Sequence, residues 1–129
     1  MLTKVTHITL FVNSQDEALN FYTDKLGFKI HTDADFQGFR WLTICLPEQP
    51  DMEIALMPAL TPEEKALVGK QGGDKPFISL ESNYCLGDYE RLNAAGVKFF
   101  EKPKTEPWGV SVAMQDLLGN TIYICQPIR

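Results

Sequence analysis

Apolar and polar residues alternate along the first stretch of the chain, THITLFV at residues 6–12. A period of two is typical of a β-strand with one buried face. The next stretch, residues 13–28, opens with cap-type residues, carries apolar residues at helical spacing and stops near Gly27, which predicts a helix. Apolar runs separated by Gly, Pro and acidic residues predict three further strands, at residues 28–34, 39–47 and 51–58.

The second half of the chain repeats this order of elements. Residues 77–83 predict a strand and residues 84–100 a helix that stops at Gly96 and runs into a strand; residues 108–116 and 120–127 predict two more strands. Three pairs of stretches match with offsets of 70, 69 and 70 residues: HITLFVN with FISLESN, KLGFK with AAGVK, and MEIAL with IYICQ. The sequence therefore predicts a duplicated β-α-β-β-β unit.

The segment at residues 59–75 has the composition of a linker. Pro62 is well placed to start a short helix through Val68, and the pair Gly72-Gly73 is typical of flexible chain. We therefore expect one domain in which module one spans residues 1–58 and module two spans residues 76–129. The length of 129 residues is ordinary for a domain with a single core.

Strand parity separates two kinds of sheet face, because successive side chains on a strand point to opposite sides. One parity is uniformly apolar and is predicted to pack on the helices: Ile8, Leu10, Val12, Met52, Ile54, Leu56, Ile78, Leu80, Ile122 and Ile124. The other parity, the mixed face, combines polar and aromatic residues: His7, Thr9, Phe11, Glu53, Ala55, Met57, Phe77, Ser79, Glu81, Thr121, Tyr123 and Cys125. Such a face suits a lined cavity, and the repeat predicts that His7, Glu53, Phe77 and Tyr123 converge on one centre.

Composition narrows the class of protein. With 44% apolar residues, 22% charged residues and a net charge of −5, the chain is typical of a globular protein and lacks the basic clusters of a nucleic-acid partner. The three cysteines form no CxxC pair, which argues against disulfides and structural zinc and predicts a reducing, cytoplasmic location. No apolar run approaches the roughly 18 residues needed to span a bilayer, and the apolar stretch at residues 8–12 is too short for a signal peptide.

The opening THITLFVNSQDEALNFYTDKLGF, the internal AAGVKF and the closing DLLGNTIYICQ resemble the vicinal oxygen chelate superfamily, the glyoxalase, bleomycin-resistance and extradiol dioxygenase group. The resemblance covers nearly the whole chain, although Leu117-Leu118 stand where the family's turn has Pro-Asp. It implies an α+β fold of two tandem βαβββ modules, whose curled mixed sheets form a cup with the helices on the convex side. It also implies a homodimer.

Metal-using members of this superfamily place ligands at four equivalent positions, which correspond here to His7, Glu53, Phe77 and Tyr123. His7 and Glu53 retain ligand chemistry, whereas Phe77 cannot coordinate a metal and the phenol of Tyr123 ionises only near pH 10. Because catalytic metals generally take about three protein ligands, His7 and Glu53 form an incomplete set, and we expect no cofactor or a weakly held divalent metal. Further donors that the sequence offers are Glu81 and His31.

Two functions follow from the resemblance. The first is a module that binds a small apolar or aromatic molecule, because aromatic side chains offer contact area in place of coordination. The second is a divalent-metal-dependent lyase, isomerase or dioxygenase acting on a vicinal-oxygen substrate; a metal-free variant uses Glu53 and Tyr123 as acid and base. The residues expected to line the ligand cavity are His7, Trp41, Met57, Phe77, Trp108, Met114 and Tyr123. Plain structural interpretations stand beside these roles: His7 in a hydrogen-bonded polar cluster, Glu53 facing solvent, and the aromatic residues Trp41, Phe77, Trp108 and Tyr123 in the core.

Overall fold

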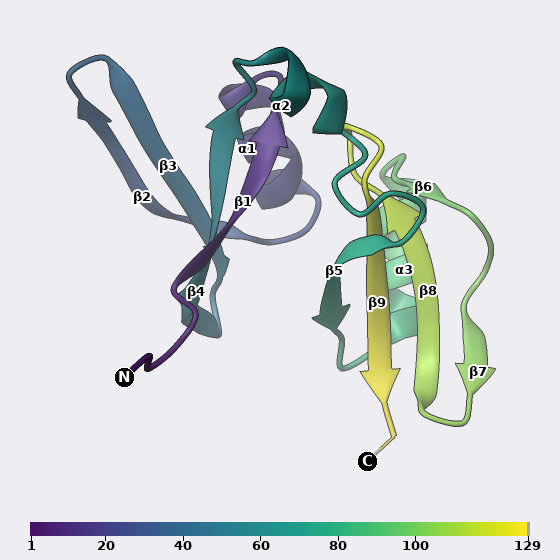
Figure 1. Cartoon of the computed structure of the whole chain (residues 1–129). Coiled ribbons are helices and arrows are strands. Elements are labelled where there is room, and N and C mark those ends of the chain that lie inside the picture. Colours follow the sequence, from purple (N-terminus) through teal and green to yellow (C-terminus); the bar gives the residue numbers. More distant parts are fainter. Residues whose placement is uncertain (129) are drawn as a thin grey trace. The chain divides into compact units, whose positions relative to one another are not determined.

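The computed structural model describes residues 1–128, which form an α+β fold with one four-stranded and one five-stranded mixed sheet (Figure 1). The chain divides into two compact units, unit one at Met1–Val68 and unit two from Gly69 onward. The division lies inside the segment that the sequence predicts as a linker. No helix among the described residues is both long and apolar enough to cross a lipid bilayer.

Unit one has the predicted strand, helix and three strands. Its elements are β1 (His7–Val12), α1 (Gln15–Asp24), β2 (Lys29–Phe36), β3 (Phe39–Leu46), β4 (Gln49–Pro58) and α2 (Pro62–Leu67). The strand order is β1-β4-β3-β2, with β1 parallel to β4 and the other pairs antiparallel. Helix α1 begins where the Ser14 hydroxyl accepts a hydrogen bond from the backbone N–H of Glu17. Helix α2 begins with a capping box between Thr61 and Glu64.

Unit two repeats this plan with one irregularity. Its elements are β5 (Pro76–Glu81), α3 (Cys85–Ala94), β6 (Lys98–Phe99), β7 (Lys104–Glu106), β8 (Gly109–Gln115) and β9 (Thr121–Pro127). The strand order is β5-β9-β8-β6, and β7 also pairs with β8. The sequence pattern does not predict β7. The edge strand is interrupted between β6 and β7 at a segment that contains Pro103, which has no backbone N–H to donate to a ladder.

The apolar parity of the strands faces the helices, as the sequence predicts. Helix α1 packs against β2 and β4, and helix α3 packs against β8 and β9. The central apolar residues of these strands are almost completely buried, namely Leu10, Val12, Ile54, Leu56, Ile122 and Ile124. Their removal from water contributes most of the stabilisation of each unit, at roughly 25 cal/mol per Å² of apolar surface.

The closing DLLGN motif forms a buried turn that anchors the start of unit two. The Asp116 carboxylate accepts hydrogen bonds from the backbone N–H groups of Leu118 and Asn120, both at 2.9 Å, and from the Asn120 side-chain amide at 3.1 Å. Asn120 Oδ1 accepts a further bond from the backbone N–H of Gln71 at 3.2 Å. Gly69 has a φ of +78°, and a Cβ there would lie 2.1 Å from the Leu118 carbonyl oxygen, so only glycine permits this approach. The motif is therefore structural.

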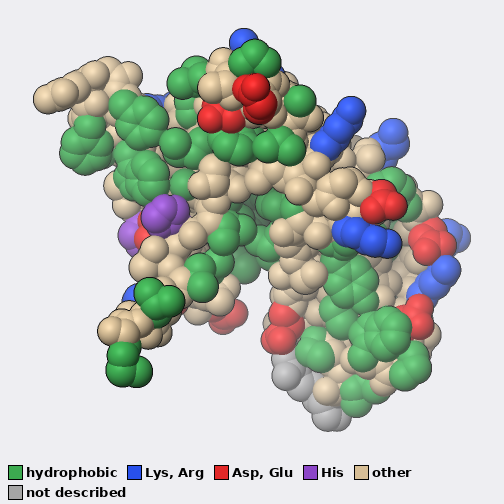
Figure 2. Space-filling view, viewed as in Figure 1, with side chains coloured by type: hydrophobic (Ala, Val, Ile, Leu, Met, Phe, Trp, Pro, Cys, Tyr) green, Lys and Arg blue, Asp and Glu red, His purple; other side chains and the backbone are tan. Residues whose placement is uncertain are grey.

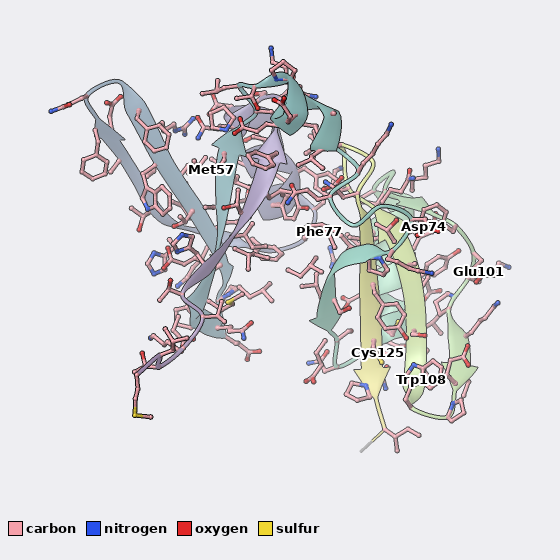
Figure 3. All side chains as sticks on the ribbon, viewed as in Figure 1. Met57, Asp74, Phe77, Glu101, Trp108 and Cys125 are labelled. Atoms are coloured by element: carbon pink, nitrogen blue, oxygen red, sulfur yellow. The ribbon has the colours of Figure 1, made fainter. Side chains whose placement is uncertain are left out.

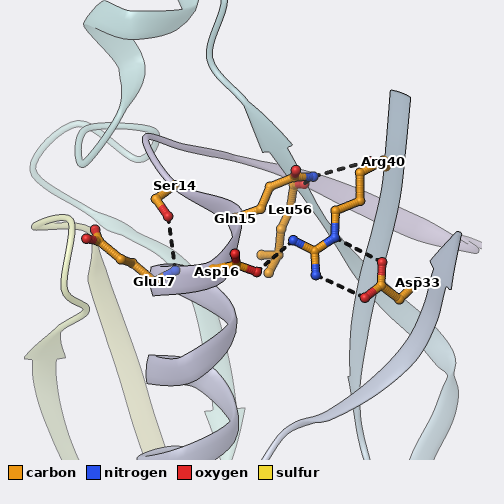
Figure 4. A network of polar contacts seen from close by, with 7 residues as sticks. All are labelled: Ser14, Gln15, Asp16, Glu17, Asp33, Arg40 and Leu56. Atoms are coloured by element: carbon orange, nitrogen blue, oxygen red, sulfur yellow. Dashed lines mark hydrogen bonds and ion pairs between the residues drawn. The ribbon is translucent and has the colours of Figure 1, made fainter. Parts of the chain in front are cut away.

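Arg40 on β3 links the first sheet to α1. Its guanidinium donates two hydrogen bonds to Asp33, both at 2.9 Å, and one to Asp16 at 2.7 Å (Figure 4). The Gln15 side chain adds bonds from α1 to the carbonyl oxygens of Arg40 and Leu56. The hydrogen bonds from Arg40 hold the pKa of Asp33 below its ordinary value of 3.8, and the two carboxylates raise the pKa of Arg40.

Substitution of Asp33 by asparagine is expected to lower the free energy of unfolding slightly at pH 7. Because the pKa of Asp33 is lower in the folded state than in the unfolded chain, the ion pair stabilises the fold above the ordinary pKa, and this contribution is lost as the pH falls through the folded-state value. The difference between wild type and Asp33→Asn should therefore shrink below pH 3.8. Urea unfolding at several pH values measures it, with Asp74→Asn as the control; a difference that persists unchanged at pH 2 would contradict the assignment.

Candidate functional site

A cluster of polar and aromatic residues lies on the mixed face of the first sheet. His7 on β1 and Glu53 on β4 are direct partners in the parallel ladder. The His7 ring meets Trp41 of β3 edge to face, with ring centroids 5.3 Å apart. Both histidines of the chain are visible on one face of unit one (Figure 2). The structure thus brings together three residues that the sequence predicts for the site.

Glu53 is held by Thr43, which the site prediction does not include, and by His31, which the sequence offers only as a further donor. Its Oε1 accepts a hydrogen bond from the Thr43 hydroxyl at 2.7 Å, and the same oxygen lies 3.2 Å from Nδ1 of His31. His31 is the extra residue of a β-bulge between Ile30 and Thr32, which is how it reaches this face. Thr43 is fully buried. Its position could have been found from parity, because it lies two residues from Trp41 on the same strand.

The cluster's side chains with metal-ligand chemistry are His7, His31 and Glu53. Catalytic divalent metals generally take about three protein ligands. Nδ1 of His7 lies 3.1 Å from the Thr6 hydroxyl, and one oxygen of Glu53 already has two partners. Within residues 1–128, no three His, Cys, Asp or Glu side chains lie close enough together to hold a metal ion. The cluster offers hydrogen bonding, aromatic contact and the carboxylate of Glu53.

A pocket of about 290 Å³ lies on the mixed face of the second sheet. Its lining comes from the neighbouring parallel strands β5 and β9 and consists of Ser79, Leu80, Glu81, Tyr123, Cys125 and Pro127. Within this lining, Ser79 is the ladder partner of Tyr123, and Glu81 is the ladder partner of Cys125. The volume lies just below the roughly 300–1,000 Å³ typical of ligand pockets. A few polar groups among apolar ones are also typical of such pockets.

Trp108 and Tyr123 are in direct contact at this pocket. The indole N–H of Trp108 donates a hydrogen bond to the Tyr123 hydroxyl oxygen at 2.9 Å. Trp108 is 56% exposed and lies in the turn before β8, where its carbonyl accepts a bond from the backbone N–H of Ile128. Trp108 and Cys125 lie near the same end of the second sheet (Figure 3). The structure therefore brings together two further residues of the predicted site.

Phe77 does not pair with Tyr123, although the sequence repeat aligns them with His7 and Glu53. A β-bulge lies between Pro76 and Ile78, and the ladder partner of Tyr123 is Ser79. The bulge contains Phe77, and an offset of 70 residues gives no sign of it. The convergence of His7, Glu53, Phe77 and Tyr123 on one centre stays a prediction.

The two methionines predicted as cavity walls lie on different faces. Met57 is the ladder partner of Phe11 on the mixed face of the first sheet and is half-buried. Met114 pairs with Ile122 and is fully buried on the face that packs against α3. This corrects the prediction for Met114. The register of β8 puts Ser111, Ala113 and Gln115, rather than Met114, on the mixed face.

The three cysteines differ in solvent exposure. Cys45 and Cys85 are buried, whereas Cys125 is half-buried and lines the pocket. Burial raises the pKa of the Cys85 thiol, so less of it is present as the reactive thiolate. Among the three cysteines, Cys125 is therefore the one at the pocket.

Comparisons with known proteins, by sequence and by structure, agree on one superfamily. The model of the Glyoxalase/Bleomycin resistance protein/Dioxygenase superfamily matches residues 4–124. YurT, an uncharacterised protein of Bacillus subtilis, is 35% identical over 126 residues, which cover 95% of this chain and 98% of YurT. The crystal structure of UcmS2 is 31% identical, with a TM-score of 0.84 over 97% of this chain and 98% of UcmS2. TnmS3, an antibiotic binding protein from Streptomyces sp. CB03234, is 26% identical, with a TM-score of 0.80 over 98% of each chain.

Proposed function

Because the chain belongs to the Glyoxalase/Bleomycin resistance protein/Dioxygenase superfamily, we propose that it binds a small apolar or aromatic molecule in the pocket of its second sheet, without a catalytic metal. The observation that carries the proposal is the pocket of about 290 Å³ on the mixed face. The similarity to TnmS3, an antibiotic binding protein, supports a binding role. The homodimer and the cytoplasmic location inferred from the sequence remain parts of this proposal.

The lining of the pocket supports an aromatic ligand. Pro127 offers apolar contact, and the Tyr123 ring offers a surface for stacking or edge contact. Ser79 and Glu81 add polar groups that orient a ligand. The volume suits a molecule of about two fused rings, for which 1-indanone is a practical probe.

Filling the pocket is expected to remove binding. Ser79→Trp adds an indole on the pocket wall and should weaken 1-indanone binding at least tenfold, whereas Thr105→Trp adds the same group on the exposed edge strand β7 and should not. Binding is measured by thermal shift, since a ligand at 100 times its dissociation constant stabilises the fold by about 2.7 kcal/mol. The same ligand should slow alkylation of Cys125 by iodoacetamide. A shift that survives Ser79→Trp, or no shift in wild type, would count against this pocket.

A metal-dependent lyase, isomerase or dioxygenase is the second candidate function. The observation that favours an enzyme is the Glu53 carboxylate, which Thr43 and His31 hold on the mixed face as a carboxylate suited to acid–base work. Metal analysis of protein purified without a histidine tag separates the two functions. Stoichiometric Ni, Zn, Mn or Fe that is lost on His7→Ala would favour the enzyme and overturn the metal-free proposal.

A further inference from the structure

The O–H group of Tyr123, on the pocket wall, donates no hydrogen bond within residues 1–128. Within residues 1–128, the one hydrogen bond of this hydroxyl is with Nε1 of Trp108, at 2.9 Å. An indole N–H is only a donor, so the Tyr123 oxygen must be the acceptor in this bond. The phenol proton itself is therefore left without an acceptor from the described part of the chain.

The Trp108 bond also restricts where this proton can point. A phenolic O–H lies near the ring plane and can turn to either side. The indole N–H occupies one side of the oxygen, and two protons that face each other repel, so the O–H turns to the other side. Trp108 is not one of the residues that line the pocket, and it bonds to one of them, Tyr123.

We propose that Tyr123 donates its hydroxyl proton to a hydrogen-bond acceptor on the ligand, and that Trp108 is the positioning residue that directs it. The ligand class is then an aromatic molecule that carries a neutral carbonyl group. This inference rests on the proposed function and deepens it. The aromatic rings occupy the apolar part of the pocket, and the carbonyl oxygen meets the phenol.

A matched pair of ligands tests the inference. 1-Indanone and indane have the same fused rings and differ in the carbonyl group. Wild type is expected to bind 1-indanone about fivefold to tenfold more tightly than indane in isothermal titration calorimetry, which corresponds to one hydrogen bond. Tyr123→Phe keeps the ring and should abolish this preference. Tyr84→Phe removes the hydroxyl of an exposed tyrosine in the same unit and should leave the preference unchanged.

A double-mutant cycle isolates the role of Trp108. Trp108→Phe should reduce the preference for 1-indanone and leave indane affinity unchanged, because Trp108 lies outside the pocket lining. In the Tyr123→Phe background, Trp108→Phe should have no further effect, since it acts through the hydroxyl that is already absent. An effect that persists in that background would mean a merely structural role and overturn the positioning assignment.

The outcomes separate this inference from the proposed function. Equal affinity of wild type for 1-indanone and indane would overturn the inference while supporting binding in the pocket. Binding of neither compound would overturn the proposed function for two-ring aromatic ligands, and the inference with it. A preference for the ketone that survives Tyr123→Phe would also overturn the inference.

Discussion

Asp116→Ala is expected to lower the free energy of unfolding by about 3–5 kcal/mol. The Asp116 carboxylate is 5% exposed and accepts hydrogen bonds from two backbone N–H groups and from the Asn120 amide. Without it, three donors lose their acceptor, two of them in buried hydrogen bonds, and each unsatisfied buried donor costs about 1–3 kcal/mol. Urea unfolding followed by tryptophan fluorescence measures the change.

Two further variants sharpen this prediction. Asp116→Asn keeps one carbonyl oxygen for the backbone donors of Leu118 and Asn120 and should have an intermediate effect. Asp74→Ala removes an exposed acidic residue of unit two and should change the free energy of unfolding by less than about 0.5 kcal/mol. Hydrogen exchange should show that the amides of Leu118 and Asn120 lose protection in Asp116→Ala. Full protection in that variant would contradict the role assigned to the carboxylate.

Tyr22→Ala should destabilise the first unit by a similar amount, about 3–5 kcal/mol. Tyr22 is fully buried on α1 and lies edge to face against Phe21 and Phe28, with ring centroids 5.5 Å apart in both pairs. Loss of the ring removes these contacts and leaves a void that the packed surroundings fill only in part. The midpoint and slope of urea unfolding give the change in stability.

The control for Tyr22 is an aromatic residue of the same unit that is exposed. Phe36 lies at the β2–β3 hairpin with 63% of its surface exposed, so Phe36→Ala should change stability little. Tyr22→Phe keeps the ring and should retain most of the stability lost in Tyr22→Ala. Equal effects of Tyr22→Ala and Phe36→Ala would show that burial of Tyr22 does not stabilise the unit.

Local signals in the sequence predict most of the elements. The alternating stretch at residues 6–12 becomes β1 at His7–Val12, and Pro62 begins α2 at Pro62–Leu67. Period and capping depend on residues that are neighbours in the chain, so they are readable without knowledge of distant contacts. The duplication is readable for the same reason, because it compares one stretch of sequence with another.

The candidate site is only partly predictable from the sequence. His7, Trp41 and Glu53 share the mixed face of one unit, as parity predicts, and Tyr123 lies at the pocket of the other. The sequence offers His31 only as a further donor, because its approach to Glu53 depends on a bulge in β2. A bulge breaks the alternation on which parity relies, and its place is decided by the pairing of two strands that are distant in sequence.

The class of fold, the duplicated unit and the apolar faces that meet the helices can be read from the sequence, because they follow from periodicity and chain-local chemistry. Which residues meet at the sites depends on the folded chain: Ser79 rather than Phe77 lies beside Tyr123, and Trp108 bonds to the Tyr123 hydroxyl. Met114 likewise lies in the core rather than on the mixed face where a cavity wall was expected. The physical reason is that strand register and bulges are set by hydrogen bonds between distant segments, and a shift of one residue exchanges the two faces of a strand.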